Sequence, residues 1–548
     1  MTFSLRVDTE PDWLHSPTDR ASATRGIRPG EPNSIEEADL VVVGAGLSGL
    51  AAAYFAQRRF GFGLRIVLME QSARVGGMAK RVELSVGTQR LTTNGGARAF
   101  SGTRSWTSPL CHGLLNELGL LASDPNPAAL DGLHKMVHMG RAGSSPGRVV
   151  AADALFQCWT PDQDPAVRRA IDELPAPRRV RDDLTRIWCP DKAPAPVSSD
   201  QLRAISYRSF LADHLGAGPE ATDFLRRRTI GTFGSPAERV PAFDALAAGM
   251  PGEAHASSLG VQRYSWIDEP ALEYSDGLAA VAESLLSRLH DRAASGGGQV
   301  DVTLRHRVFS ITPGADGVAV TAHGPTGPSH FQAPRVVFAG SARSMARVVE
   351  GLPVDVHDAL ERVVKPPMCY VNVAVRSWES MVSLGAREVW SPDEFFYDVA
   401  LRVPAGGPRG GAGILELVHR PLGDDAGIDF RHEARQASQA LLDTRAESFR
   451  SAVVDQLDAL LGPYGFDAER DIADVVVNAW PHTYSPPWNS LVDDRDAFVA
   501  EMKKTRRPIE GLAVAGVDSH RFGWAQVAID AGERAVNDLP EPGRQATW

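Results

Sequence analysis

The chain has 548 residues, of which 43% are hydrophobic and 23% are charged, as in a folded globular protein rather than a collagen, a coiled coil or a disordered chain. Its 57 basic and 68 acidic residues give a formal net charge of -11, which argues against nucleic acid as a partner. The length exceeds that of a usual single domain, so we expect two or more closely joined domains.

Residues 1–37 are expected to form a flexible leader, because they include no apolar segment of the kind that a secretory signal peptide needs. The following run, residues 40–56, is interrupted by glycines and is interpreted as a strand, a turn and a helix rather than as a membrane span. The 4 cysteines are far apart and suggest neither a disulfide framework nor a zinc site. We therefore expect a cytoplasmic protein without a membrane span or a metal site.

Hydrophobic patterning predicts an α/β protein. A βαβ unit comes first, with strands at 39–43 and 64–70 around a helix that includes 50–56. A mainly helical layer is expected from about 101 to 271, and the α/β pattern then returns. The later predictions are a helix at 277–289, strands at 299–303 and 308–312, a pairing of 317–322 with 329–338, a second sheet from 370–375, 395–401 and 414–419, a strand at 512–516 and a helix at 525–539.

A glycine motif lies inside the βαβ unit. Gly44, Gly46 and Gly49 fit the pattern G-x-G-x-x-G, with Leu47 and Ser48 at the start of the helix. Such a turn brings the backbone and the positive end of a helix close to a pyrophosphate. Glu70 ends the second strand, at a position where an acidic side chain can bind the ribose of a dinucleotide. Gln71 follows it and is expected to contact the cofactor as well. The motif predicts a Rossmann-like dinucleotide site.

Further motifs extend this site into a resemblance to a family. Arg74-Val75-Gly76-Gly77 follows Glu70, and a strand near the C-terminus ends in Gly516-Val517-Asp518. With the first motif, these segments resemble the flavin amine oxidase superfamily. The resemblance implies FAD, held noncovalently because no cysteine follows Cys369. It also implies contacts to FAD from the residues Met78, Asn94, Gly95, Gly96, Ala97, Val308, Asp518, Ala525, Gln526 and Val527.

Four shorter segments are similar to spermidine dehydrogenases: residues 76–81, 206–211, 376–378 and 477–484. This likeness extends from about residue 39 to residue 539. Two departures are Met78, where members of that group often carry histidine, and the pair Pro486-Pro487. Some spermidine dehydrogenases contain haem, which remains open here although no haem-binding pattern supports it.

The chemistry expected from the resemblance suggests six catalytic or substrate-binding candidates. Aromatic walls hold an alkylamine and favour its neutral form, which directs attention to Trp480, His482, Tyr484 and Trp524. His482 can also accept the ammonium proton. The resemblance places Lys365 beside a water near flavin N5 and Arg98 where it can bind a substrate carboxylate. The alternative for each is a structural role: core aromatic residues, a structural histidine and a solvated surface lysine.

The sequence therefore predicts an FAD-dependent amine dehydrogenase or oxidase acting on a C–N bond of a polyamine or related amine, by hydride transfer to flavin N5 and hydrolysis of the imine. Residues 38–100, 270–345 and 505–540 are expected to form a three-layer, Rossmann-like FAD-binding domain. Residues 101–269 and 346–504 are expected to form a substrate-binding domain with a mixed sheet and helices. Alternatives are an amino-acid or specialised-metabolite oxidase, a carotenoid-type desaturase, or a binding protein with structural FAD. The electron acceptor, oxygen or another, stays open, and so does a homo-oligomer.

Overall fold

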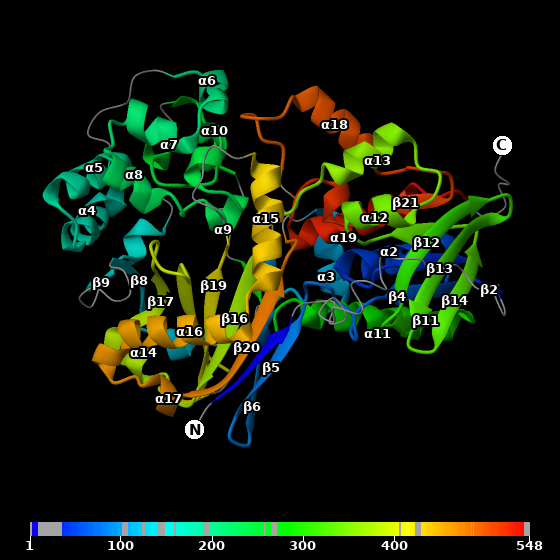
Figure 1. Ribbon diagram of the computed structural model, residues 1–548, viewed down its shortest axis with the longest axis horizontal. Helices are drawn as coiled ribbons and strands as arrows, with labels where there is room; N and C mark the ends of the chain where they lie inside the picture. The colour runs from blue at the N-terminus through cyan, green and yellow to red at the C-terminus, as the bar shows by residue number, and fades with distance from the viewer. Residues whose placement is uncertain are drawn as a thin grey trace.

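The computed structural model has two lobes, one on either side of helix α15 (Phe430–Asp443) in Figure 1. It describes residues 3–8, 35–100, 108–122, 127–139, 148–157, 160–189, 197–256, 259–264, 271–404, 407–421, 429–483, 485 and 487–541. None of the helices in these ranges is long and apolar enough to cross a membrane.

A parallel five-stranded sheet organises the first lobe. Its order is β11-β4-β3-β15-β21, built from Gln299–Leu304, Arg65–Glu70, Leu40–Val43, Val336–Phe338 and Leu512–Val514. All neighbouring pairs are parallel. The strands are therefore contributed by segments far apart in the sequence, and the predicted βαβ unit of β3, α2 (Leu47–Phe60) and β4 lies at the centre.

Side chains of this sheet alternate between two cores, which makes the lobe three-layered. Leu40, Val42 and Leu68 pack on the helical side, whereas Val41 and Val67 pack against the other layer. The helical layer contains α2, α3 (Pro109–Glu117), α11 (Ala279–Gly296) and α19 (Ala525–Asn537). The opposite layer is a four-stranded sheet of β12 (Arg307–Gly314), β13 (Gly317–Gly324), β14 (Gly327–Ala333) and β2 (Ile35–Glu37), with α12 (Ala342–Val348) and α13 (Val354–Glu361) nearby. The three-layer Rossmann-like fold is confirmed.

The second lobe contains a mixed eight-stranded sheet in the order β1-β20-β16-β19-β18-β17-β8-β9. The strands are Ser4–Asp8, Ile472–Trp480, Met368–Val375, Gly413–His419, Asp398–Arg402, Ala386–Trp390, His134–Met139 and Arg148–Ala151. One core joins the sheet to α14 (Glu379–Leu384), α15 and α16 (Ala446–Leu461). The mixed sheet with helices matches the expected fold class.

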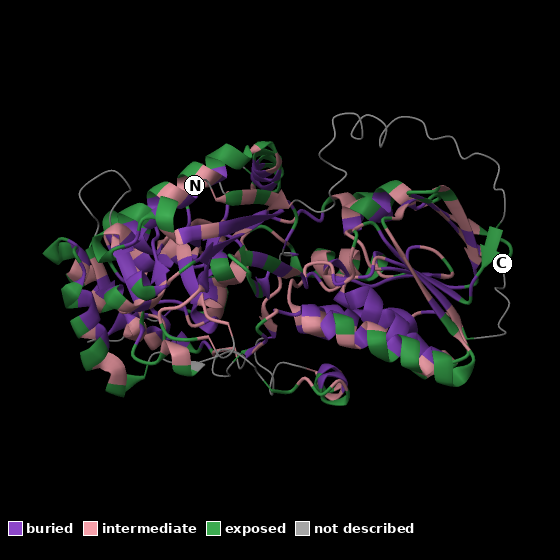
Figure 2. Cartoon of the chain, turned by 90° about the horizontal axis from the view of Figure 1, so that it is seen from below, coloured by how far each residue is buried: buried purple, intermediate pink, exposed green. Residues whose placement is uncertain are grey.

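A second core joins this sheet to a helical layer. Its helices are α4 (Asp164–Glu173), α5 (Arg178–Trp188), α6 (Ser199–Ala204), α7 (Tyr207–Ser209), α8 (Pro219–Leu225), α9 (Ile230–Phe233) and α10 (Ala242–Ala247). Two more, α17 (Ala468–Asp471) and α18 (Arg495–Lys504), flank β20 and the crossing back to the first lobe. Figure 2 shows buried residues concentrated in the interior of both lobes.

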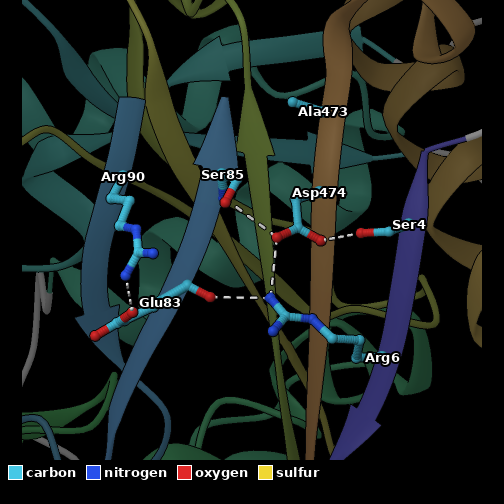
Figure 3. Close-up of a pocket in the computed structure, with 7 residues that line it drawn as sticks. All are labelled: Ser4, Arg6, Glu83, Ser85, Arg90, Ala473 and Asp474. Carbon is cyan, nitrogen blue, oxygen red and sulfur yellow. Dashed lines mark hydrogen bonds and ion pairs between the residues drawn. The ribbon is translucent and has the colours of Figure 1, made fainter. Parts of the chain in front are cut away.

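The expectation of a flexible leader over residues 1–37 is wrong for its two ends. Strand β1 pairs in parallel with β20, and β2 pairs with β14; residues 9–34 lie outside the described part. Figure 3 shows how polar contacts fix β1: Arg6 donates to Asp474 and to the backbone oxygen of Glu83, both at 2.9 Å, and Ser4 also donates to Asp474. Isolated charged residues near the N-terminus gave no sign of this pairing, because its partner Asp474 is distant in sequence.

Several strands were not predicted. The hairpin of β5 (Arg81–Val86) and β6 (Gln89–Asn94), the short pair β7 (Ala99–Phe100) and β10 (Leu272–Glu273), and β8, β9 and β20 all fall where helix or no element was expected. The predicted pairing of 329–338 with 317–322 is correct only to Ala333, since Val336–Phe338 crosses into the parallel sheet.

Candidate cofactor and substrate site

The predicted glycine turn has the geometry that a dinucleotide requires. Gly44 has φ 100° and donates its N–H to the backbone oxygen of Met69 at 2.7 Å. A methyl group on Gly49 would lie 1.9 Å from the oxygen of Gly44, so only glycine allows α2 to start this close to the turn. The first backbone N–H groups of α2, from Leu47 and Ser48 onward, have no helical acceptor and form a binding place for a phosphate.

The second glycine pair lies directly against the first turn. Gly76 donates its N–H to the oxygen of Ala45 at 2.8 Å, and a Cβ on Gly77 would lie 3.2 Å from the Cα of Gly46. Both Gly76 and Gly77 have positive φ, at 104° and 58°. This arrangement exposes backbone rather than side chains between the two turns, which fits a pyrophosphate group.

Glu70 is buried at the end of β4 and contacts the first glycine turn and the segment that leads to the second. Its carboxylate accepts hydrogen bonds from the N–H of Ala45 at 2.9 Å and of Ser72 at 2.8 Å. A carboxylate with two backbone donors is held rigidly and still has lone pairs for ribose hydroxyls. The neighbouring Gln71 is exposed, and Val308 lies at the start of β12, close to His306, whose N–H bonds the oxygen of Glu70. These residues fit the adenosine half of FAD.

The C-terminal segment docks on the same helix. Gly516 donates its N–H to the side-chain hydroxyl of Ser48 at 2.6 Å. A Cβ on Gly532 of α19 would lie 2.6 Å from the backbone oxygen of Ser48, so α19 packs closely on α2. The first turn of α19, with Ala525, Gln526 and Val527, follows Trp524. The two predicted segments, separated by most of the chain, are therefore in direct contact.

Asp518 and Lys365, which sequence reasoning assigned to separate places, form an ion pair. Lys365 Nζ lies 3.1 Å from Asp518 Oδ1, and Asp518 Oδ2 accepts the Ala342 N–H at 3.0 Å. Burial raises the pKa of Asp518, but Lys365 and the Ala342 N–H together outweigh it and hold that pKa below its usual range. Lys365 is only 14% exposed, so it is not a solvated surface lysine.

His482 is close to this ion pair. Its backbone neighbour Thr483 donates to the oxygen of Pro366 at 2.9 Å, which fixes the segment beside Lys365. The surrounding protein, together with the positive charges of Lys365 and Arg343, lowers the pKa of His482 to about 4, although the side chain remains accessible. At such a pKa the imidazole of His482 is neutral at physiological pH and weakly basic, and its role as acceptor of the ammonium proton stays a prediction.

Trp480 ends β20 beneath the loop that was expected to face the flavin. Its indole N–H donates to the oxygen of Gly95 at 2.7 Å, and a Cβ on Gly96 would meet Met78 O at 2.5 Å and the Trp480 ring at 3.3 Å. Ala97 donates its N–H to the same Met78 oxygen at 2.7 Å. Trp480 and Met78 therefore support the loop from both sides, and Trp480 is buried. The loop's predicted contact with FAD stays a proposal.

Arg98 does not present a free charge for a substrate carboxylate. It lies 2.6 Å from Glu416, whose other oxygen accepts from Asn94 Nδ2 at 2.9 Å, and Arg402 lies 3.0 Å from Glu416 as well. Burial raises the pKa of Glu416, but Arg402 and Arg98 outweigh it and lower that pKa to about 2. The carboxylate is thus charged and pairs with one nitrogen of Arg98, whose side chain is 38% exposed; the predicted contact of Arg98 with a substrate carboxylate stays a prediction.

A cavity of about 640 Å³ opens beside Trp524, the residue that precedes α19. Its aromatic lining includes Phe522, whose ring stacks on Trp524 at 6.0 Å, and Trp488. Sequence reasoning identified Trp524 but missed Phe522, Trp488 and the cavity arginines; the motif around 480–488 pointed only to their neighbourhood. Of the other predicted residues, Tyr484 lies outside the described part of the chain.

The second pocket, drawn in Figure 3, surrounds the β1 contacts and has its charged groups paired internally. No group of three or more His, Cys, Asp or Glu within the described ranges is arranged to hold a metal ion. The cavity at Trp524 is therefore the better candidate for a substrate.

Comparisons with known proteins agree with this geometry. A family model described as an NAD(P)-binding Rossmann-like domain matches residues 42–114, and no curated protein matches the sequence. Putrescine oxidase bound to putrescine superposes with a TM-score of 0.56 at 18% identity, over 92% of this chain and 99% of that one. Cyclohexylamine oxidase from Brevibacterium oxydans IH-35A gives 0.55 at 16% identity, over 91% and 98%.

A proposed protoporphyrinogen oxidase from Exiguobacterium sp. 255-15 gives a TM-score of 0.57 at 15% identity, over 92% of this chain and 98% of that one. Since nearly the whole of each of these structures is matched, the likeness covers both lobes and not the dinucleotide motif alone. The chain therefore has the fold of the flavin amine oxidases.

Proposed function

We propose that the protein is an FAD-dependent oxidoreductase that oxidises a C–N bond of a small amine. The observation that carries this proposal is the convergence at α19: its helix packs on α2 of the glycine turn, while Trp524 at its start lines the cavity. A dinucleotide site and a cavity with aromatic and charged side chains in its wall thus meet at one helix end. The fold shared with putrescine oxidase and cyclohexylamine oxidase supports the same chemistry.

The residues that would hold FAD are those of the two glycine turns, with Glu70 at the ribose and the Gly516–Asp518 turn farther along. When bound, FAD supplies an acceptor for the hydride that leaves the carbon next to the amine nitrogen. The imine that results is hydrolysed to a carbonyl compound. Noncovalent binding of FAD is part of this proposal and predicts that acid precipitation releases the yellow cofactor.

The protein's own task is to bind the amine in its neutral form. We assign to the aromatic rings of Trp524, Phe522 and Trp488, which line the cavity, the task of shielding the amine from water, because loss of water disfavours an ammonium ion. His482 at a pKa of about 4 does not retain a proton at neutral pH, so we assign deprotonation chiefly to desolvation. The Lys365–Asp518 pair fixes the turn before α19, and a water held by Lys365 remains part of the proposal.

The sequence resemblance favours a polyamine, by way of spermidine dehydrogenase, as the substrate. One observation favours the second candidate, an amino acid or related acidic amine: 5 of the residues that line the cavity are arginine, against 4 aspartate or glutamate. The lining therefore has one more positive than negative side chain, which favours a ligand with an acidic group over a polycation.

The test is anaerobic titration of the purified holoprotein while the flavin absorbance is followed. Bleaching by spermidine, putrescine, other amines or amino acids is expected for at least one class and would identify it. Readmission of air then separates an oxidase, which recovers its colour within seconds, from a dehydrogenase, which recovers slowly. If no amine of any class bleaches the flavin, the proposed function is wrong.

A further inference from the structure

The cavity beside Trp524 has one arginine that differs from the others in its wall. Four lining arginines lie within 4 Å of a carboxylate: Arg203 with Asp244 (3.6 Å), Arg239 with Glu433 (2.6 Å), Arg362 with Glu501 (2.6 Å) and Arg431 with Asp493 (3.7 Å). The fifth is Arg521. Among the residues that the structure describes, no carboxylate forms an ion pair with it.

Arg521 is nevertheless buried, with 8% of its surface exposed. Its Nη2 makes one long contact, 3.4 Å to the backbone oxygen of Ala359, and its buried Nε has no hydrogen-bond partner within the described ranges. A buried guanidinium normally has its charge and its five N–H donors satisfied. Burial lowers the pKa of Arg521, while Asp518 and Glu501 act from a distance in the opposite direction. The donors of Arg521 are thus available to a group that enters the cavity.

The backbone at this position is also unusual. Arg521 has φ 52°, a left-handed conformation that only one other non-glycine residue in the described ranges adopts, Arg305. Side chains avoid this conformation because of a steric clash, and it persists chiefly where surrounding structure enforces it, often at binding sites. Here the turn after Asp518 enforces it, through the Arg521 N–H bonded to the Asp518 oxygen at 3.3 Å. The same turn leads into Trp524.

We propose that Arg521 binds a carboxylate of the substrate, so that the amine oxidised by this protein is an amino acid or another amine carrying an acidic group. The inference rests on the proposed function and narrows its substrate class. A guanidinium and a carboxylate match in shape and charge and form two parallel hydrogen bonds. Arg98, by contrast, is already paired with Glu416.

The experiment compares substrates that differ only by a carboxylate: ornithine with putrescine, phenylalanine with phenethylamine, and tryptophan with tryptamine. Anaerobic rates of flavin bleaching are measured for the wild type, for Arg521→Gln and for Arg521→Lys. We expect the acidic member of at least one pair to react at lower concentration in the wild type, and Arg521→Gln to weaken it by about 10- to 100-fold, the range for loss of a charge-assisted hydrogen bond. Arg521→Lys keeps the charge and is expected to lose less.

Arg335→Gln is the matched control, because it removes a similarly buried arginine, 6% exposed, that bonds to the backbone oxygens of Pro540 and Asp39 and does not line the cavity. It is expected to leave the ratio between the two members of each pair unchanged. Binding of 3-phenylpropionate and of its amide, followed by the flavin spectrum, adds a readout that needs no turnover. Only the acid is expected to bind, and Arg521→Gln is expected to abolish its binding.

The outcomes separate this inference from the proposed function. If putrescine, phenethylamine or tryptamine bleaches the flavin as well as its acidic partner does, the carboxylate site is wrong and amine oxidation stands. If no member of any pair reacts and spermidine and the other amines also leave the flavin unchanged, amine oxidation itself fails. If Arg521→Gln is purified without flavin while Arg335→Gln retains it, Arg521 contacts the cofactor instead, and the inference is overturned.

Discussion

Replacement of Gly49 by alanine tests whether close contact between α2 and the first glycine turn is needed for cofactor binding. The added methyl would lie 1.9 Å from Gly44 O and 3.2 Å from a methyl of Val42. A carbon–oxygen contact needs about 3.3 Å, so the start of α2 must retreat by about 1.4 Å. Such overpacking costs about 1–3 kcal/mol of unfolding free energy, and the retreat also moves the N–H groups away from the phosphates.

We expect Gly49→Ala to be purified with little flavin, and its apoprotein to melt at a lower temperature than that of the wild type. The measurements are the ratio of flavin to protein absorbance and the melting temperature by calorimetry. Gly113→Ala is the matched control, because Gly113 lies within α3 and an added Cβ meets nothing within 4 Å. It is expected to gain about 0.5–1 kcal/mol from helix propensity. A Gly49→Ala protein with full flavin content and unchanged melting would refute the packing argument.

Two further predictions concern buried charges near the C-terminal turn. Lys365→Met leaves the Asp518 carboxylate buried without its cation, so we expect it to lower the free energy of unfolding by about 3 kcal/mol in urea titrations. The double variant with Asp518→Asn removes the buried charge as well and is expected to recover part of the loss. A double variant less stable than Lys365→Met would contradict this. Burial, Arg506 and Arg534 lower the pKa of His520 to about 3 from 6.5. The unfolded chain therefore binds the proton more readily, so the contribution of His520 to stability is complete above pH 6.5 and is lost as the pH falls toward 3. His520→Asn is expected to reduce the fall of the melting temperature between pH 7 and pH 4 in calorimetry. The same dependence on pH in the wild type and in the variant would count against this.

Local patterns predicted the parts of the fold that depend on neighbouring residues. The unit β3, α2 and β4 combines an apolar strand, a glycine turn and a helix within one short segment, and it lies where expected. Strand β8 could not be found in the same way, because it joins the large sheet only through β17, more than two hundred residues later. Strand β1 was missed for the same reason, since its apolar residues are few and its partner β20 is remote.

In the candidate site, too, the features set by neighbouring residues were predicted, whereas those set by distant parts of the chain were not. Glu70 and the glycines were predicted because their roles depend on spacing along the chain. The pairing of Lys365 with Asp518 and of Arg98 with Glu416 depends on which lobes and strands meet, which no spacing encodes. Arg521 carried no signal in the sequence. It stands out because no carboxylate among the described residues forms an ion pair with it, which only the three-dimensional arrangement reveals.

The position of β1 at the edge of the large sheet has a consequence for how the protein can be handled. β20, beside it, is buried along nearly its whole length and contains the run Val475-Val476-Val477. A chain shortened to begin near the dinucleotide motif would keep β20 paired with β16 but would leave its other edge without a partner, and unpaired apolar edges recruit strands from other molecules. The few residues of β1, closed by the Arg6–Asp474 ion pair, thus act as a guard against self-association. We therefore expect the N-terminal segment to protect the protein from aggregation as well as to complete its fold.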